Sequence, residues 1–167
     1  AEFLGHPFID MVHPSRSREE SRKKYSLGSE VKTIGLLPGS RMNEINSLLD
    51  VMIQAAEKIR SELGSCQFLL PVADSIDPDL IRQRLGANSL GIQLVEGEPY
   101  DVMNSCDMLI IASGSATLEA GILRCPMVII YKLNPLTYWM VRWLIKVPFI
   151  GLVNLVAGEE VAPELIQ

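Results

Sequence analysis

Residues 31–41 read VKTIGLLPGSR and join an apolar run to a sharp turn. The apolar run at 31–37 is typical of a buried strand, which Pro38-Gly39 ends. A helical period follows, with apolar residues spaced three and four apart at Ile45, Leu48, Leu49, Met52, Ile53, Ala56 and Ile59. Gly64 stands where the glycine that ends a helix belongs. The stretch therefore predicts a strand, a tight turn and an amphipathic helix in succession.

The same order of strand and helix recurs along the chain. Further apolar runs predict strands at 66–72, 92–95, 107–112 and 126–131. Helices are predicted between and after them, at 78–86, 99–105, 116–123 and from Pro135 onward. Strands and helices that alternate in this way predict an α/β fold, a Rossmann-like parallel sheet with helices on both faces and right-handed crossovers.

The two ends of the chain differ from its regular middle. Residues 1–30 are mixed and polar, and we interpret the basic run at 16–24 as the solvated face of a linker that leads into the domain. Residues 31–167 are expected to form one domain with an ample apolar core. Residues 163–167 read like the first turn of an interrupted helix, so we expect a truncated fragment of a longer chain.

Composition narrows the class of protein. The formal net charge of -5 argues against a nucleic-acid partner, which would need clustered Lys and Arg. Cys66, Cys106 and Cys125 match no metal pattern and are interpreted as reduced, buried residues of a cytosolic protein. The N-terminus shows no signal-peptide pattern. We therefore expect no metal and no other cofactor.

The turn after the first predicted strand is a candidate anion site. Gly39 would let a ligand approach the backbone, and the next helix presents free N–H groups and the positive end of its dipole. Ser40 could cap the helix or donate to a phosphate oxygen, and Arg41 offers a planar cation suited to phosphate. Glu44, in the first helical turn, could close a capping box. The residues alone leave two readings open, a phosphate site and a plain capped helix.

A second turn of this kind follows the fourth predicted strand. Ser113, Gly114 and Ser115 place small hydroxyl residues around a glycine before a helix, which continues through Thr117. Glu119 lies about one helical turn further on, where its carboxylate could accept both hydroxyls of a ribose or serve only as a surface charge. Two such turns in one sheet favour a diphosphate linked to a sugar.

Other chemistries find less support. The standard dinucleotide and NTPase phosphate motifs are absent, as is the GxSxG elbow of serine hydrolases. Both histidines, His6 and His13, lie in the linker, and His6 is interpreted as structural. The aromatic and basic segment 133–156 fits either a membrane-surface helix or a core helix that packs against a missing domain.

Several blocks of the chain resemble the lipid-A-disaccharide synthase family of bacterial glycosyltransferases. These blocks cover nearly the whole sequence and comprise Gly5–Asp10, Leu36–Ile45, Ala112–Glu119, Pro126–Lys132, Pro135–Trp139, Val153–Gly158 and Val161–Leu165. The resemblance implies two Rossmann-like domains facing a cleft (GT-B), with this chain as the C-terminal, UDP-binding half. The family transfers 2,3-diacylglucosamine from UDP to 2,3-diacylglucosamine 1-phosphate, with inversion and without a metal, and releases UDP.

The resemblance also implies roles for single residues. Gly39, Ser40, Arg41 and the 113–115 turn would hold the diphosphate, with Thr117 in the same motif, and Glu119 would hold the ribose. Asn154 lies in a family motif that faces the cleft and is a candidate donor or acceptor contact. The catalytic base is expected in the missing N-terminal domain, so this chain would contain no catalytic residue.

The resemblance places the enzyme in the cytoplasm, peripheral at the inner membrane, because both substrates carry acyl chains. It leaves room for a homodimer. Two alternatives to the transferase stay open, a UDP-sugar 2-epimerase-like domain and a non-catalytic nucleotide-binding domain. The epimerase would not need the aromatic segment after Lys132, and the binding domain would not explain two anion turns.

Overall fold

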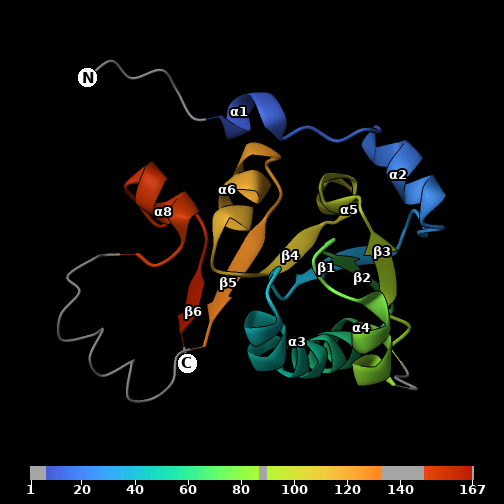
Figure 1. The fold of residues 1–167 in the computed structure, drawn as a ribbon. Coiled ribbons are helices and arrows are strands. Elements are labelled where there is room, and N and C mark those ends of the chain that lie inside the picture. Colours follow the sequence, from blue (N-terminus) through green and yellow to red (C-terminus); the bar gives the residue numbers. More distant parts are fainter. Residues whose placement is uncertain (1–6, 87–89, 133–148, 167) are drawn as a thin grey trace.

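The computed structural model describes residues 7–86, 90–132 and 149–166. Its centre is a parallel sheet of six strands in the order β3-β2-β1-β4-β5-β6 (Figure 1). The strands are β1 (Lys32–Leu37), β2 (Cys66–Val72), β3 (Gln93–Glu96), β4 (Met108–Ala112), β5 (Met127–Tyr131) and β6 (Glu164–Ile166). The predicted α/β fold, with its Rossmann-like parallel sheet, is therefore confirmed.

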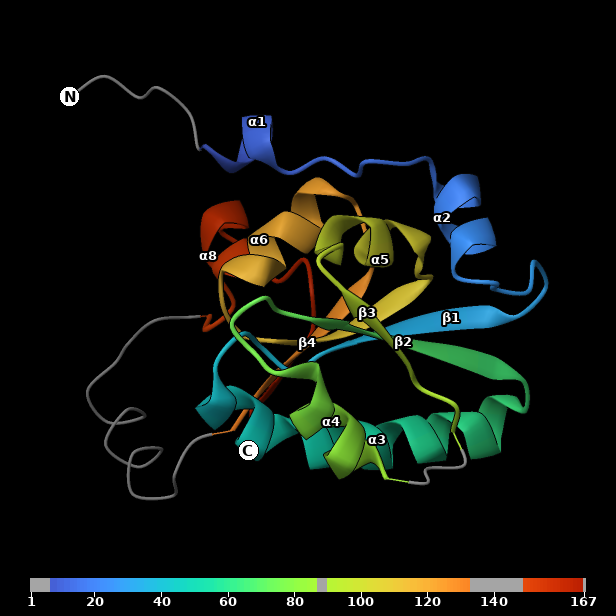
Figure 2. The ribbon, with the colours of Figure 1, turned by 45° about the vertical axis from the view of Figure 1, so that its right-hand side comes forward.

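Helices cover both faces of the sheet, as predicted (Figure 2). One face carries α3 (Met42–Leu63) and α4 (Pro78–Leu85). The opposite face carries α5 (Pro99–Ser105), α6 (Ser115–Ile122) and α8 (Leu152–Ala157). Two short N-terminal helices, α1 (Phe8–Met11) and α2 (Arg18–Lys24), run along that same side.

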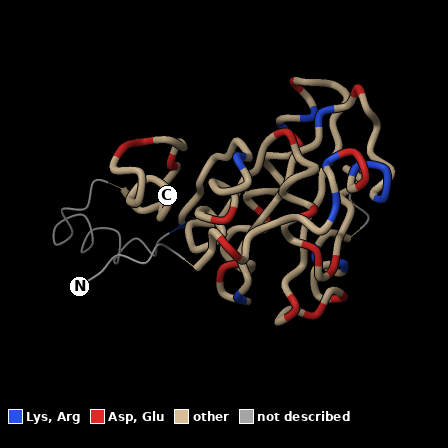
Figure 3. Tube along the Cα trace, turned by 90° about the horizontal axis from the view of Figure 1, so that it is seen from above, with Lys and Arg blue, Asp and Glu red and all other residues tan. Residues whose placement is uncertain are grey.

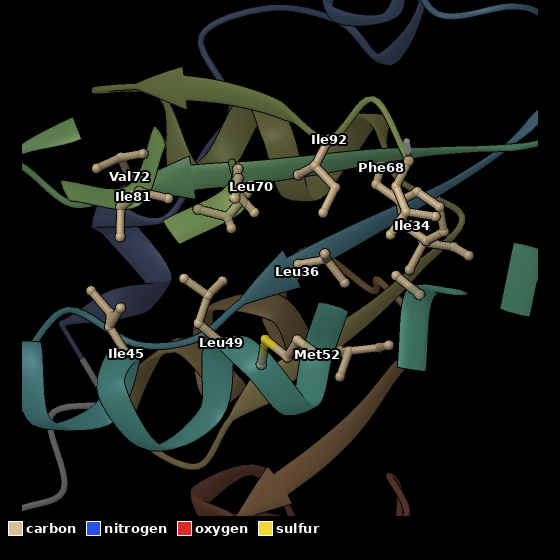
Figure 4. Packing of buried hydrophobic residues seen from close by; sticks show 14 of the residues in the cluster. Ile34, Leu36, Ile45, Leu49, Met52, Phe68, Leu70, Val72, Ile81 and Ile92 are labelled. Carbon is tan, nitrogen blue, oxygen red and sulfur yellow. The ribbon is translucent and has the colours of Figure 1, made fainter. Parts of the chain in front are cut away.

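The α3 face holds one of two buried apolar clusters. Ile45, Leu49 and Met52 of α3 point toward Leu36, Leu70 and Phe68 of the sheet (Figure 4). Each of these six side chains is nearly or fully buried, and burial of a side chain of this size contributes about 1.5–3 kcal/mol. The apolar residues whose spacing predicted this helix thus hold it against the sheet, and its N-terminus lies at the carboxyl edge of the sheet.

The opposite face holds the second cluster, in which the cysteines take part. Val102 and Met103 of α5 pack with Leu109, Ile111 and Ile129 of the sheet. Cys106 and Cys125 belong to this cluster, and Cys66 belongs to the first. All three thiols are buried and free, so their interpretation as reduced core residues is confirmed.

The interpretation of residues 163–167 as a helical turn is wrong. Residues 164–166 form β6, which pairs in parallel with β5 in the register Ile129↔Glu164. The amide of Ile129 donates to the carbonyl of Pro163 at 2.9 Å. The free hydrogen-bonding edge of β5 thus determines the conformation here, and a proline that looked like a helix opener precedes an edge strand instead.

The interpretation of the basic run at 16–24 as a solvated face is also wrong. Arg16 pairs with Asp101 at 2.8 Å, and Arg18 pairs with Asp107 at 3.0 Å. The Arg22 guanidinium donates to the carbonyls of Gly28 and Ser105. The cations are therefore used to dock α2 on α5. The assignment of 1–30 as a linker stays a prediction, although residues 7–30 pack on the fold.

The remaining charges are distributed over the molecule. In Figure 3 basic and acidic positions are interspersed along the described trace and are not separated by sign. No helix within the described ranges is long and apolar enough to span a bilayer. The aromatic and basic residues at 133–148, which suggested a membrane or domain contact, lie outside the described residues, as does His6.

Candidate functional site

A pocket of about 510 Å³ opens at the carboxyl edge of the sheet. Turns that follow four neighbouring strands line it, together with residues of α3, α5 and α6. These lining residues are Leu37, Gly39, Ser40, Arg41 and Glu44; Pro71, Val72, Ala73 and Asp74; Gly97, Pro99 and Met103; and Ala112, Ser113, Gly114, Ser115, Ala116 and Glu119. The volume is typical of a small-molecule site, and the carboxyl edge is where open parallel sheets bind ligands.

The turn between β1 and α3 forms one wall. Gly39 has a φ of 111°, a backbone conformation that residues with a side chain rarely adopt. A Cβ atom at this position would stand 2.1 Å from Oε2 of Glu44. From the sequence, Gly39 was expected to let a ligand approach the backbone. In the structure, the space that a side chain would fill is occupied by Glu44.

Glu44 caps this helix, as its position in the first turn predicted. Its Oε2 accepts hydrogen bonds from the amides of Ser40 at 3.0 Å and Arg41 at 3.3 Å. Arg41, and not Ser40, is the residue at the N-cap of α3. The side chain of Arg41 is 82% exposed and contacts Glu44 at 3.4 Å.

The turn between β4 and α6 forms the facing wall. Ser113 donates from its amide to the carbonyl of Ile130 at 3.1 Å and from its hydroxyl to Ile150 at 3.3 Å. Gly114 is extended, with a φ of 166°, and nothing lies within 4 Å of a Cβ built on it. Its surroundings in the fold would therefore accept a side chain, in contrast to those of Gly39.

Glu119 reaches the same pocket from the second turn of α6. Its side chain is partly buried, and this burial raises the pKa of the carboxyl, while a hydrogen bond with Ser115 acts in the opposite direction. Burial raises the pKa of Tyr100 on α5, and the nearby charge of Glu119 raises it further. The carboxylate is thus held at the wall of the pocket by the helix that starts at Gly114.

Two of the predicted site residues do not line this pocket. Thr117 is fully buried, and its hydroxyl donates to the carbonyl of Gly114 at 2.8 Å, so it stabilises the first turn of α6. Asn154 is also fully buried, on α8. The expectation that Asn154 faces the cleft is therefore not met in this structure.

Both polar atoms of the Asn154 side chain form hydrogen bonds within the chain. Its nitrogen donates to the carbonyl of Ala162 and to Glu164, each at 2.7 Å. Its oxygen accepts from the amides of Val161 at 2.9 Å and Ala162 at 3.0 Å. These bonds connect α8 to the segment that enters β6.

The sequence reasoning missed the walls that follow β2 and β3. Asp74 follows β2, and Gly97 and Pro99 follow β3, where no glycine and serine cluster marks a phosphate turn. The available signal was topological, because the carboxyl ends of all parallel strands meet at one edge.

Within the described residues, no group of three His, Cys, Asp or Glu side chains could hold a metal ion.

Glu98, between Gly97 and Pro99, connects this wall of the pocket to the N-terminal segment. It accepts hydrogen bonds from Lys24 at 2.5 Å, from the Tyr25 hydroxyl at 2.9 Å and from Arg16 at 3.1 Å. Lys24 and Tyr25, followed by Arg16, lower the pKa of Glu98 from 4.5 to about 2. Arg16 also pairs with Asp101, so the cluster holds α5 beside α2.

This lowered pKa predicts a pH dependence of stability. A carboxyl with a depressed folded-state pKa stabilises the protein above its unfolded-state pKa, and this contribution is lost as the pH falls toward about 2. Wild type should therefore lose more of its free energy of unfolding than Glu98→Gln between about pH 6 and about pH 3. Urea unfolding at both pH values measures the difference, with Glu57→Gln on α3 as an exposed control. Equal losses in wild type and Glu98→Gln would contradict the role of this cluster.

Comparison with solved structures supports the fold that this architecture defines. The glycosyltransferase WaaG, involved in lipopolysaccharide biosynthesis, matches 97% of this chain and 41% of its own, with a TM-score of 0.63 and 16% identity. A glycosyl transferase of family 9 from Veillonella parvula matches 98% of this chain and 41% of its own, with a TM-score of 0.59 and 14% identity. The fold is therefore that of one Rossmann-like domain of GT-B glycosyltransferases.

The family follows from the sequence comparisons. The family model described as Lipid-A-disaccharide synthetase matches residues 1–167, and the chain belongs to this family. Lipid-A-disaccharide synthases from Nitrosococcus oceani and Syntrophus aciditrophicus are 46% and 43% identical over 99% of the chain. The chain spans 43% of the length of each of these relatives and matches their C-terminal part.

Proposed function

We propose that this chain is the donor-binding part of a lipid-A-disaccharide synthase. The complete enzyme would transfer 2,3-diacylglucosamine from UDP to 2,3-diacylglucosamine 1-phosphate, with inversion and without a metal. One observation carries the proposal: in a chain of this family, Gly39–Arg41, Ser113–Ser115 and Glu119 converge on one pocket. The family match does not favour the epimerase-like domain or the non-catalytic binding domain.

The chemistry of the pocket suits a leaving diphosphate. Arg41 supplies a planar, permanently charged donor, and the start of α6 supplies backbone amides and the positive end of a helix dipole. Such fixed donors stabilise the negative charge that develops on UDP as its bond to the sugar breaks. Glu119 lines the same pocket and would accept the ribose hydroxyls.

The partners and location belong to the same proposal. The catalytic base would lie in an N-terminal domain across the cleft, so the chain alone would bind UDP weakly and would not turn over. The enzyme would act in the cytoplasm at the surface of the inner membrane, since acylated substrates come from a bilayer, with the 133–156 segment as a candidate contact. Assembly as a homodimer is compatible with this arrangement. Robust transferase activity of the chain alone would contradict the assignment of the base.

Calorimetric titration tests the donor site. UDP should bind more tightly than GDP, because the donor of this family carries uracil as its base. Inorganic phosphate should bind most weakly, because it lacks both the base and the ribose. Equal affinity for UDP and phosphate would contradict the proposal, since it would leave the nucleoside without a role.

A substitution at Gly114 gives a sharper form of this test. The added methyl group of Gly114→Ala meets nothing within 4 Å, and the extended backbone accepts alanine, so the thermal midpoint should stay unchanged. The methyl group would stand where the diphosphate approaches the backbone, and UDP affinity should fall by about tenfold, equivalent to about 1.4 kcal/mol. Unchanged UDP affinity in a folded Gly114→Ala variant would count against diphosphate binding at this turn.

A further inference from the structure

The 38–41 turn, which carries Ser40 and Arg41 into the pocket, is fixed by two side chains. Glu44 accepts the amide hydrogens of Ser40 and Arg41, at 3.0 and 3.3 Å. The hydroxyl of Ser75 donates to the carbonyl oxygen of Ser40 at 2.8 Å. Both backbone polar groups of Ser40 are therefore bound by side chains of the protein.

The two side chains come from different elements of the fold. Glu44 belongs to the first turn of α3, directly after the turn. Ser75 belongs to the loop between β2 and α4, whose residues Ala73 and Asp74 line the pocket. Next to Ser75, the side chain of Ile76 is buried in the cluster on the α3 face. The backbone amide of Ile76 donates to the carbonyl of Ala73, and both interactions anchor this loop. The turn is thus connected to a second wall of the pocket.

Glu44 accepts from two of the turn amides, those of Ser40 and Arg41, so these two amides are not free for a ligand. The Ser40 hydroxyl and the Arg41 guanidinium are then the side-chain donors that this turn offers to an anion. The side chain of Arg41 is 82% exposed and also contacts Glu44 at 3.4 Å. The position of that guanidinium depends on the conformation of the turn, which Gly39 allows because Glu44 fits against it.

We infer that Glu44 and Ser75 are positioning residues of the donor site, which hold the 38–41 turn so that Arg41 and Ser40 face the diphosphate. The inference rests on the proposed function, because it concerns the same pocket. Neither side chain acts on the sugar. Each acts through the backbone of the turn, and a ligand site that is organised before binding loses less entropy on binding.

The test compares Glu44→Ala, Glu44→Gln and Ser75→Ala with the wild-type chain. Loss of the cap should weaken UDP binding by about three- to thirtyfold, the fold-change equivalent to the free energy that capping side chains contribute to helix stability. Glu44→Gln keeps an oxygen of the same reach and should stay within about threefold of wild type, and Ser75→Ala should lose about threefold. Uridine affinity should stay unchanged in all three variants, which a general loss of structure would not produce. Glu57→Ala, on the exposed side of α3, is the matched control.

Amide hydrogen exchange measured by NMR without ligand provides the second readout. Exchange at Ser40 and Arg41 should accelerate in Glu44→Ala and stay unchanged in Glu57→Ala. Faster exchange with unchanged or tighter UDP binding would overturn the inference and leave the proposed function intact, since tighter binding would make Glu44 a competitor of the diphosphate. If wild type binds UDP no better than phosphate, the proposed function fails, and the inference fails with it.

Discussion

Replacement of Arg41 by alanine is expected to weaken UDP binding by about 10- to 100-fold. The reason is the loss of a charge-assisted hydrogen bond to the diphosphate, which contributes about 1.5–3 kcal/mol. Arg41→Lys should recover part of the affinity, because a lysine keeps the charge but lacks the planar pair of donors. Calorimetric titration of each variant with UDP measures the effect.

Two controls separate this loss from damage to the fold. The Arg41 side chain is 82% exposed, so the variant should unfold within about 0.5 kcal/mol of wild type. Arg84→Ala, on α4, removes a guanidinium that pairs with Asp50 and does not line the pocket, and it should leave UDP affinity unchanged. Wild-type affinity in Arg41→Ala would remove this residue from the donor site.

The Asn154→Ala variant is expected to lose about 3 kcal/mol of its free energy of unfolding. Alanine would leave the amide and the carbonyl of the buried residue Ala162 without their side-chain partners, and the amide of Val161 would keep only its bond to Glu159. Glu164, which also accepts from the amides of Ile150 and Gly151, would lose its bond with the Asn154 side chain. For a chain of this size the thermal midpoint should fall by roughly 6–12 °C.

Calorimetric unfolding measures the Asn154 effect, and Asn43→Ala is the matched control. Asn43 is exposed on α3, so its replacement should change stability by no more than about 0.5 kcal/mol. A stable Asn154→Ala chain with impaired UDP binding would support the ligand contact that the sequence suggested. A destabilised chain with intact affinity per folded molecule would support the structural role.

The sequence predicted the parts of the fold that local patterns determine. The apolar period predicted α3, because it marks one face of a helix. Glycine and serine predicted the turns at Gly39 and Gly114, because they often lie where a strand ends and a helix begins. Glu44 was predicted as a capping residue because its partners lie three and four residues away. These short-range relations are the ones that one chain can show without its tertiary structure.

The features that were missed depend on distant partners. Arg16 and Asp101 lie 85 positions apart, and nothing in the basic run indicated which carboxylates would neutralise it. The residues at 164–166 become a strand only because β5 offers a free edge. Asn154 looked like a ligand contact because its motif belongs to the family, but its polar atoms bind a segment that folds back beside α8.

The most direct test of the central claim is a crystal structure of the chain soaked with UDP. The account predicts diphosphate density between the Gly39–Arg41 turn and the Ser113–Ser115 turn, with Arg41 on a phosphate oxygen and the ribose at Glu119. UDP bound at another place on the chain, with this pocket empty, would contradict the account.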